Sequence, residues 1–250
     1  MIREIKMTCL KFSNMKKADS VVIVCAGPSL STYKKEVVNY IKENHSLVIS
    51  ANYNHAAFGI KSDYTYITDQ NKLIENISLI ESNLVIPAKM KTDYNLDKIK
   101  KVMNRYKGVK FFISHKFFNK PYSVYKIGGA EHNTVYSDSL PIKMNKNGEF
   151  RYRRLGSAGQ GSVLLSVLCR PKKILIVGLD GPLNIGDKEI SKELYDGSKI
   201  AYDKDKFYRI ANFIESKMIP FIASRNIVIE TFNDVNFYGI DKAKMGIKIL

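Results

Sequence analysis

The sequence has few cysteines, and their placement argues against a disulfide framework or a structural zinc site. Cys9, Cys25 and Cys169 are odd in number and far apart. Both kinds of site require cysteines or histidines at short paired spacings. We therefore expect the chain to fold in a reducing compartment, without disulfides.

Long apolar runs are also absent. No segment approaches the roughly 20 consecutive apolar residues that a membrane-spanning helix needs. The first 20 residues are basic but lack the continuous apolar core of a secretory signal. We expect a cytoplasmic protein. It could in addition bind peripherally to the inner face of the cytoplasmic membrane.

Acidic residues are in the minority. The chain has 40 Lys and Arg against 24 Asp and Glu, a formal net charge of +16. Such an excess favours an anionic partner: nucleic acid, an acidic membrane surface or a phosphorylated substrate. A lysine-rich surface that only faces water is the alternative. The basic residues are scattered, with no recognisable nucleic-acid-binding module, so specific nucleic-acid binding is disfavoured.

Short apolar runs alternate with helical patterns, and we predict one domain over residues 1–250. Seven runs are candidate strands: Val21–Cys25, Leu47–Ser50, Tyr64–Thr68, Leu84–Ile86, Val109–Ile113, Lys173–Gly178 and Asn226–Ile229. Several are rich in Val and Ile without alternation, which is typical of strands covered on both faces. The fold class predicted is α/β, a Rossmann-like, mostly parallel sheet flanked by helices.

The intervening helices are predicted from capping residues and apolar spacing. Ser31 or Thr32 can cap the first helix, and Asp69 can cap another. Further helical patterns cover 96–106 and 162–169. Residues 114–155 break the alternation with several glycines, prolines and aromatic residues, and we predict a lid-like insertion there, since long loops in compact domains commonly cover a site.

Small or polar residues follow several predicted strands. The first strand is followed by Ala26, Gly27, Pro28 and Ser29, the second by Asn52, the third by Asp69 and the sixth by Asp180. In doubly wound sheets, ligands bind at the carboxyl ends of the strands. Glycine allows close backbone approach, and helix-start amides can donate to a phosphate. Ordinary turns, one with a serine cap, are the alternative for the first two sites.

A second glycine-rich stretch, LGSAGQGS at 155–162, precedes the sixth strand. Its backbone amides can converge on an anion around Ser157, Ala158, Gly159 and Gln160. Tight packing of a helix on the sheet is the alternative. The stretch lacks the Lys-Ser/Thr ending of a P-loop and the position of a dinucleotide fingerprint, so ATP or NAD binding by those motifs is disfavoured.

Three stretches in order, VVIVCAGPSL at 21–30, VISANYN at 48–54 and GSAGQGSVLLSVLCRPKKILIVGLDG at 156–181, resemble the bacterial sialyltransferases of glycosyltransferase family 42. Flagellin glycosylation proteins and hydroxymethylpterin pyrophosphokinases share that scaffold. The resemblance implies a GT-A-variant-like fold and a CMP-sugar donor. It implies donor contacts at 26–29, Asn52 and Asp69, a nucleotide held by 157–159, and a functional acid at Asp180.

The chain departs from this family after the strand-end Asp180. Gly181 and Pro182 stand where the family has tyrosines for the leaving phosphate, and no histidine lies beyond His132. Lys188, hydroxyls or amides can stabilise that phosphate without a metal. His132 is the candidate general base, because the ordinary pKa of histidine suits proton transfer near neutral pH. Glu131 and Asp180 are its rivals, and a plain surface-loop histidine is the alternative.

We therefore expect a glycosyltransferase that uses a nucleotide-activated sugar to modify a surface glycan or a lipid-linked acceptor, with no metal and no cofactor. One alternative is a Mg²⁺-dependent pyrophosphokinase with Asp69 and Asp180 as ligands; another is a basic nucleic-acid-binding protein. A homo-oligomer is compatible with either enzyme.

Gly27→Val is expected to abolish nucleotide binding and leave the fold intact.

Overall fold

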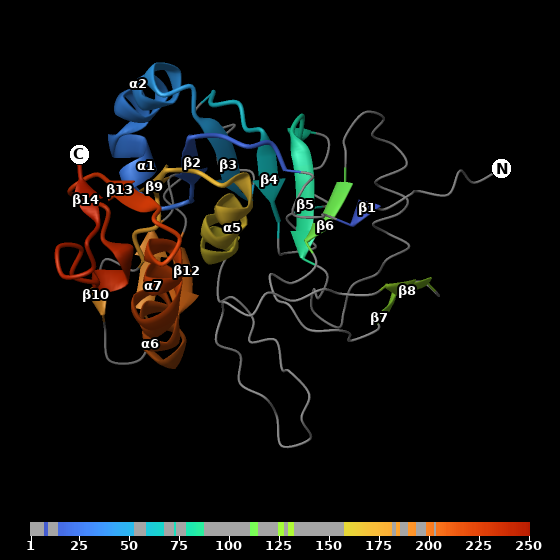
Figure 1. The fold of residues 1–250 in the computed structure, drawn as a ribbon. Helices are drawn as coiled ribbons and strands as arrows, with labels where there is room; N and C mark the ends of the chain where they lie inside the picture. Colours follow the sequence, from blue (N-terminus) through green and yellow to red (C-terminus); the bar gives the residue numbers. More distant parts are fainter. Residues whose placement is uncertain are drawn as a thin grey trace.

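A nine-stranded sheet organises the chain, in the order β1-β6-β5-β4-β3-β2-β9-β13-β14 (Figure 1). The computed structural model describes residues 8–9, 15–52, 59–67, 73, 79–87, 111–114, 125–127, 130–132, 158–181, 184–185, 190–193, 199–202 and 204–250. The strands of the sheet are β1 (Thr8–Cys9), β2 (Ser20–Val24), β3 (Leu47–Ala51), β4 (Tyr64–Tyr66), β5 (Asn83–Pro87), β6 (Phe111–Ser114), β9 (Lys173–Val177), β13 (Val228–Thr231) and β14 (Lys248–Ile249).

All neighbouring strands of this sheet pair in parallel. Seven strands have three or more residues, and the edge strands β1 and β14 have two each. These seven are the predicted strands, each with ends within two residues of the predicted ones. Central strands are buried throughout, as in β2 and β3, which confirms the interpretation of their Val- and Ile-rich composition.

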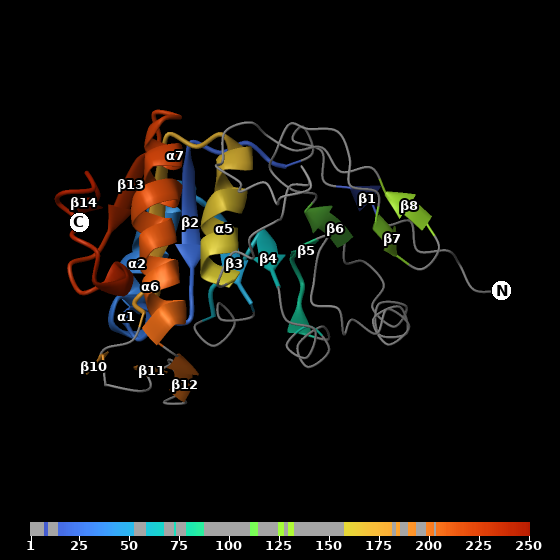
Figure 2. The same ribbon diagram turned by 90° about the horizontal axis from the view of Figure 1, so that it is seen from below.

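Helices cover both faces of the sheet (Figure 2). On one face lie α1 (Ser29–Thr32) and α2 (Lys34–Glu43); on the other lie α5 (Ala158–Ser166), its 3₁₀ extension η3 (Val167–Cys169), α6 (Lys204–Phe213), the π-helical η4 (Ile214–Met218) and α7 (Ile219–Ala223). None of the described helices has the length and apolar character to cross a bilayer. The Rossmann-like α/β class is thus confirmed.

Smaller elements lie beside the sheet. Strands β7 (Tyr125–Ile127) and β8 (Ala130–His132) form an antiparallel pair, β10 (Asn184–Ile185), β11 (Ile190–Glu193) and β12 (Lys199–Tyr202) form a second sheet, and a 3₁₀ turn, η5 (Phe237–Gly239), follows β13. Most of the predicted insertion at 114–155, and the predicted helix at 96–106, lie outside the described residues. The GT-A-variant assignment and the lid remain predictions.

Two helices begin earlier than predicted. The first starts at Ser29, so Ser31 and Thr32 lie inside α1 and do not cap it. The reason is a cap from far along the chain: Oδ2 of Asp180 accepts the Ser29 N–H at 2.8 Å. The helix expected from residue 162 begins at Ala158, so its glycines are helical.

A buried carboxylate ties the last strand to the sheet. Glu230 on β13 is 3% exposed, accepts a hydrogen bond from the Tyr40 hydroxyl and pairs with Lys248 Nζ at 2.8 Å. Burial alone would raise the pKa of Glu230, but hydrogen bonds from Lys248 and Tyr40 and the nearby Lys173 charge leave it below its ordinary value. Its ionised form therefore stabilises the fold, and this contribution is lost as the pH falls through the folded-state pKa.

Glu230→Gln should lower the free energy of unfolding by about 2 kcal/mol at pH 7, because a charge-assisted network loses its charge. The difference from the parent should shrink as the pH is lowered to 3, where the parent carboxylate is protonated too. Urea unfolding at both pH values measures this. Lys172→Ala, which removes an exposed ion pair with Asp19, is the control and should cause no measurable change. Equal losses in the two variants would contradict the assignment.

Candidate functional site

The turns that follow β2 and β9 are bonded directly to each other. The two strands are neighbours at the point where the strand order changes direction. The Gly27 N–H donates to the Gly178 carbonyl at 2.8 Å, and the Ser29 N–H donates to Oδ2 of Asp180 at 2.8 Å. The Gly178 N–H donates back to Oγ of Ser29 at 3.0 Å. The switch point, where doubly wound folds commonly bind ligands, is bridged here by the protein itself.

Glycine is required at position 27 by this bridge. A Cβ there would lie 2.1 Å from Oδ2 of Asp180 and 2.6 Å from the Gly178 carbonyl oxygen. The close approach that glycine permits is therefore made by another part of the chain. Ala26 and Pro28 are half-buried on either side, and Ser29 is buried.

Asp180 acts as a cap for α1. Its side chain is 2% exposed, and its carbonyl accepts the Tyr238 N–H at 3.2 Å. A Cβ at Gly181 would lie 2.9 Å from Cγ of Tyr238, so the turn is wedged between the 26–29 turn and η5. A carboxylate at a helix start is favourable for the same reasons as a bound phosphate. It takes the Ser29 amide that the sequence suggested for a donor phosphate.

Asn52 lies further along the same edge, directly after β3. Its φ of 57° is in the left-handed region, which asparagine tolerates better than most residues. Its N–H donates to the Tyr66 carbonyl at 2.8 Å, and its own carbonyl accepts from Ser50 Oγ at 3.0 Å. The side-chain oxygen Oδ1 is buried and has no hydrogen-bond partner in the described part of the chain. A buried amide oxygen in this state is unfavourable unless something else donates to it.

The beginning of α5 packs against the ring of Tyr66, the residue that is bonded to this asparagine. A Cβ at Gly161 would lie 2.2 Å from Cε1 of Tyr66, the residue whose carbonyl holds Asn52. Within the described ranges, Ser162 Oγ is a second buried polar atom without a partner, and this side chain is 0% exposed. Asn52 Oδ1 and Ser162 Oγ, both without a partner among the described residues, thus lie in segments that each contact Tyr66.

The predicted cradle at 155–162 is described from Ala158 onward. Ala158, Gly159 and Gln160 are buried residues at the start of α5, and the cradle itself remains a prediction. Nε2 of Gln160 donates to the Ile210 carbonyl at 3.4 Å, which joins α5 to α6. The packing alternative therefore accounts for Gly161.

Four predicted residues are not placed. Asp69, Ser157 and Lys188 lie outside the described residues. His132 ends β8, where its backbone pairs with Tyr125, and its side chain is likewise outside the described part. Among the described residues, no three His, Cys, Asp or Glu side chains form a group that can hold a metal ion.

Cys25 and Cys169 are both buried in the core. Burial, and the nearby Asp63 charge, raise the pKa of the Cys169 thiol to about 12. A thiol with so high a pKa is not a nucleophile at neutral pH. It contributes packing, at the end of η3.

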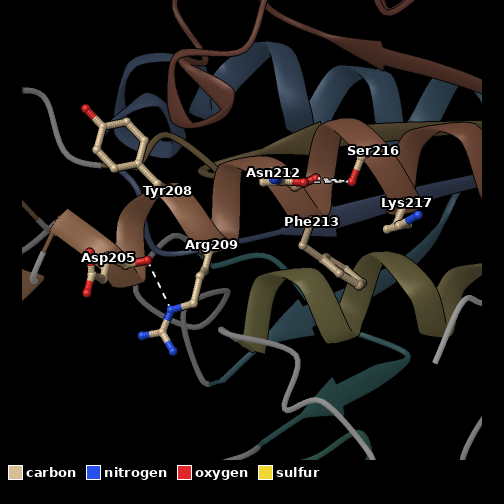
Figure 3. Close-up of a pocket in the computed structure, with 7 residues that line it drawn as sticks. All are labelled: Asp205, Tyr208, Arg209, Asn212, Phe213, Ser216 and Lys217. Atoms are coloured by element: carbon tan, nitrogen blue, oxygen red, sulfur yellow. Dashed lines mark hydrogen bonds between the residues drawn. The ribbon is translucent and has the colours of Figure 1, made fainter. Parts of the chain in front are cut away.

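A hollow of about 540 Å³ along α6 and η4 was not expected from the sequence (Figure 3). It is lined by Asp205, Tyr208, Arg209, Asn212, Phe213, Ser216 and Lys217. The signal that was available is the spacing of these residues, three or four apart, which puts polar and aromatic side chains on adjoining faces of one helix.

No protein-family model, curated protein or solved structure matches the chain. The proposals below therefore depend on its geometry and on its motifs.

Proposed function

We propose that this chain is a glycosyltransferase that takes its sugar from a nucleotide-activated donor, with a CMP-sugar as the first candidate. Support comes from the doubly wound parallel sheet, whose carboxyl edge carries small and polar turns. It comes also from the resemblance of 21–30, 48–54 and 156–181 to sialyltransferases. The observation that carries the proposal is the buried amide oxygen of Asn52, which has no hydrogen-bond partner among the described residues, after a strand whose neighbour β4 carries Tyr66, the residue that α5 packs against.

The donor is proposed to lie between Asn52 and the first turn of α5. The first four amides of a helix have no partner within it, and a helix start attracts anions. At α1 the corresponding amide is bonded to Asp180, which makes α5 the better phosphate site. The donor phosphate would meet the α5 amides, and a donor group on the nucleotide or sugar would reach Asn52 Oδ1.

In this proposal Asp180 is a positioning residue that holds the two turns together. Sugar transfer requires a base that removes the proton of the acceptor hydroxyl and groups that stabilise the leaving phosphate. His132 and Lys188 are proposed for these tasks, and the transfer is proposed to need no metal. The acceptor is a surface glycan or lipid-linked glycan, and the net charge of +16 would favour an anionic membrane face.

Thermal shift with CMP, UDP, GDP, ADP and their sugars, with and without Mg²⁺, tests the proposal. A ligand at 100 times its Kd stabilises the fold by about 2.7 kcal/mol. That corresponds to a rise in Tm of about 5–10 °C for a chain of this size. We expect CMP or a CMP-sugar to produce this rise without Mg²⁺.

Asn52→Gly should weaken that binding about tenfold, the effect of one lost hydrogen bond in a buried site. Glycine keeps the left-handed backbone, so the apo Tm should change little. Asn226→Gly is the matched control, since Asn226 has a φ of 58° and is exposed. A shift by ATP only with Mg²⁺ would replace the proposal with a phosphotransferase, and no shift by any nucleotide would overturn it.

A further inference from the structure

The hollow along α6 and η4 has the size and the polarity of a ligand site. Its volume of about 540 Å³ lies within the roughly 300–1,000 Å³ of small-molecule pockets. Figure 3 shows Arg209 and Phe213 extending from one side of the helix and Tyr208 from the other. Tyr208 is 55% exposed, with its ring edge-on to the ring of Phe207 at a centroid distance of 5.4 Å, so most of the ring is open to a ligand.

The helix changes its winding within this hollow. Ile214–Met218 is π-helical, and such turns are rare and frequent at functional sites. Ile214 and Met218 are buried, so the altered turn is anchored in the core. On its outer side, Ser216 Oγ donates to the Asn212 carbonyl at 2.6 Å and is 2.8 Å from Asn212 Oδ1. The turn therefore presents a hydroxyl and an amide together.

Two cations lie at separate points along the hollow. Arg209 and Lys217 are eight residues apart, which is about 12 Å along a helix axis. Nε of Arg209 donates to the Asp205 carbonyl at 3.0 Å, which holds the guanidinium beside the helix. A single phosphate cannot meet both cations at this separation. A ligand that pairs with both carries acidic groups spaced along a chain.

The composition of the hollow favours a sugar chain over a nucleic acid. Asp205 lies on the same lining, so the charged side chains of the described lining residues sum to one positive charge. Nucleic acids carry a charge at each phosphate and require several cations. The Asn212 and Ser216 pair matches sugar hydroxyls, and an exposed Tyr208 can stack on a sugar ring.

We propose that this hollow binds an acidic oligosaccharide, with acid groups at Arg209 and Lys217, hydroxyls at Asn212 and Ser216, and a ring against Tyr208. Its position suits an acceptor: Phe207 in the first turn of α6 is 5.7 Å from the Tyr238 ring, and the Tyr238 N–H is bonded to the Asp180 carbonyl at the carboxyl edge. The acceptor role rests on the proposed function, whereas binding of the acidic glycan does not.

Isothermal titration of the full chain at low salt tests the proposal. The probes are an oligosialic acid, a hyaluronan octasaccharide, a glycerol-phosphate-linked glycan, neutral maltohexaose and a ten-residue oligothymidylate. We expect at least one acidic glycan to bind at least tenfold more tightly than maltohexaose, and the carboxylate and phosphate probes show which acid group is preferred. Equal binding of acidic and neutral glycans, or tighter binding of the oligothymidylate, would overturn the proposal.

Matched variants separate a specific site from general charge. Arg209→Gln with Lys217→Gln should weaken glycan binding at least tenfold, and Tyr208→Ala several-fold. Lys35→Gln with Lys244→Gln removes the same two charges from exposed positions elsewhere and should change binding less than twofold. Equal losses in the two double variants would overturn the site.

The same variants distinguish this proposal from the proposed function. The Arg209→Gln and Lys217→Gln double variant should keep the full thermal shift with CMP, because the donor is proposed to bind at Asn52 and α5. Loss of the CMP shift would overturn the separation of the two sites. Glycan binding without any nucleotide shift in the parent protein would support this site and contradict the glycosyltransferase.

Discussion

Gly27→Ala lowers the free energy of unfolding by about 3 kcal/mol, because the added methyl has no room. Its carbon would lie 2.1 Å from Oδ2 of Asp180 and 2.6 Å from the Gly178 carbonyl oxygen, and the second of these is backbone. Relief therefore requires β2 and β9 to separate at their ends or the α1 cap to break. Urea unfolding measures the change, which corresponds to a fall in Tm of about 6–12 °C.

Gly246→Ala is the control for this variant. Gly246 has a positive φ of 68°, unlike Gly27, but nothing lies within 4 Å of a Cβ there, so only backbone strain of about 1 kcal/mol is expected. Equal losses at the two glycines would contradict the bridge between the turns. The bridge also makes Gly27→Val a folding variant, and the expectation that it leaves the fold intact is wrong.

Gly161→Ala is expected to destabilise by about 2 kcal/mol, although helix propensity alone predicts the opposite. Alanine in the middle of a helix is favoured over glycine by about 1 kcal/mol. Here the methyl would lie 2.2 Å from Cε1 of Tyr66, whose side chain is 1% exposed and cannot move aside. Packing on the sheet therefore outweighs propensity.

A double-mutant cycle tests this reason. In a Tyr66→Leu background the ring is gone, and Gly161→Ala should become neutral or stabilising by up to about 1 kcal/mol, a reversal of sign. Both steps are measured by urea unfolding, with circular dichroism confirming that helix content is kept. Stabilisation by Gly161→Ala in the parent protein would show that the helix is not seated on Tyr66.

The strands could be predicted because a strand that is buried on both faces has a continuous run of apolar residues in the sequence. Runs such as Val21–Cys25 and Lys173–Gly178 are apolar on both faces, and each forms a central strand. The start of α1 could not be predicted, because its capping group comes from Asp180, 151 residues away, while the nearby Ser31 and Thr32 have the composition of caps. Local patterns carry no information on such a partner.

The positions of the candidate site residues were predicted in part for the same reason. The sequence placed Asn52 directly after a strand, as the structure does, and parallel pairing puts it on the same edge of the sheet as Gly27. Whether a glycine in such a turn faces a ligand or another turn depends on which segment packs against it. That is set by the tertiary structure and cannot be read from the local sequence. The hollow on α6 was missed because polar residues spaced three or four apart are ordinary for an exposed helix, so their spacing alone does not distinguish a hollow from a solvated face.

The bridge between the two turns also constrains the order in which the chain can fold. Residues 26–29 leave the ribosome long before residue 180, at about 5–20 residues per second. Until β9 has been made and paired, α1 lacks its cap and β2 has only one of its two eventual neighbours. Contacts so distant in sequence form slowly. The amino-terminal half of the nascent chain therefore cannot complete its part of the sheet until β9 has been synthesised.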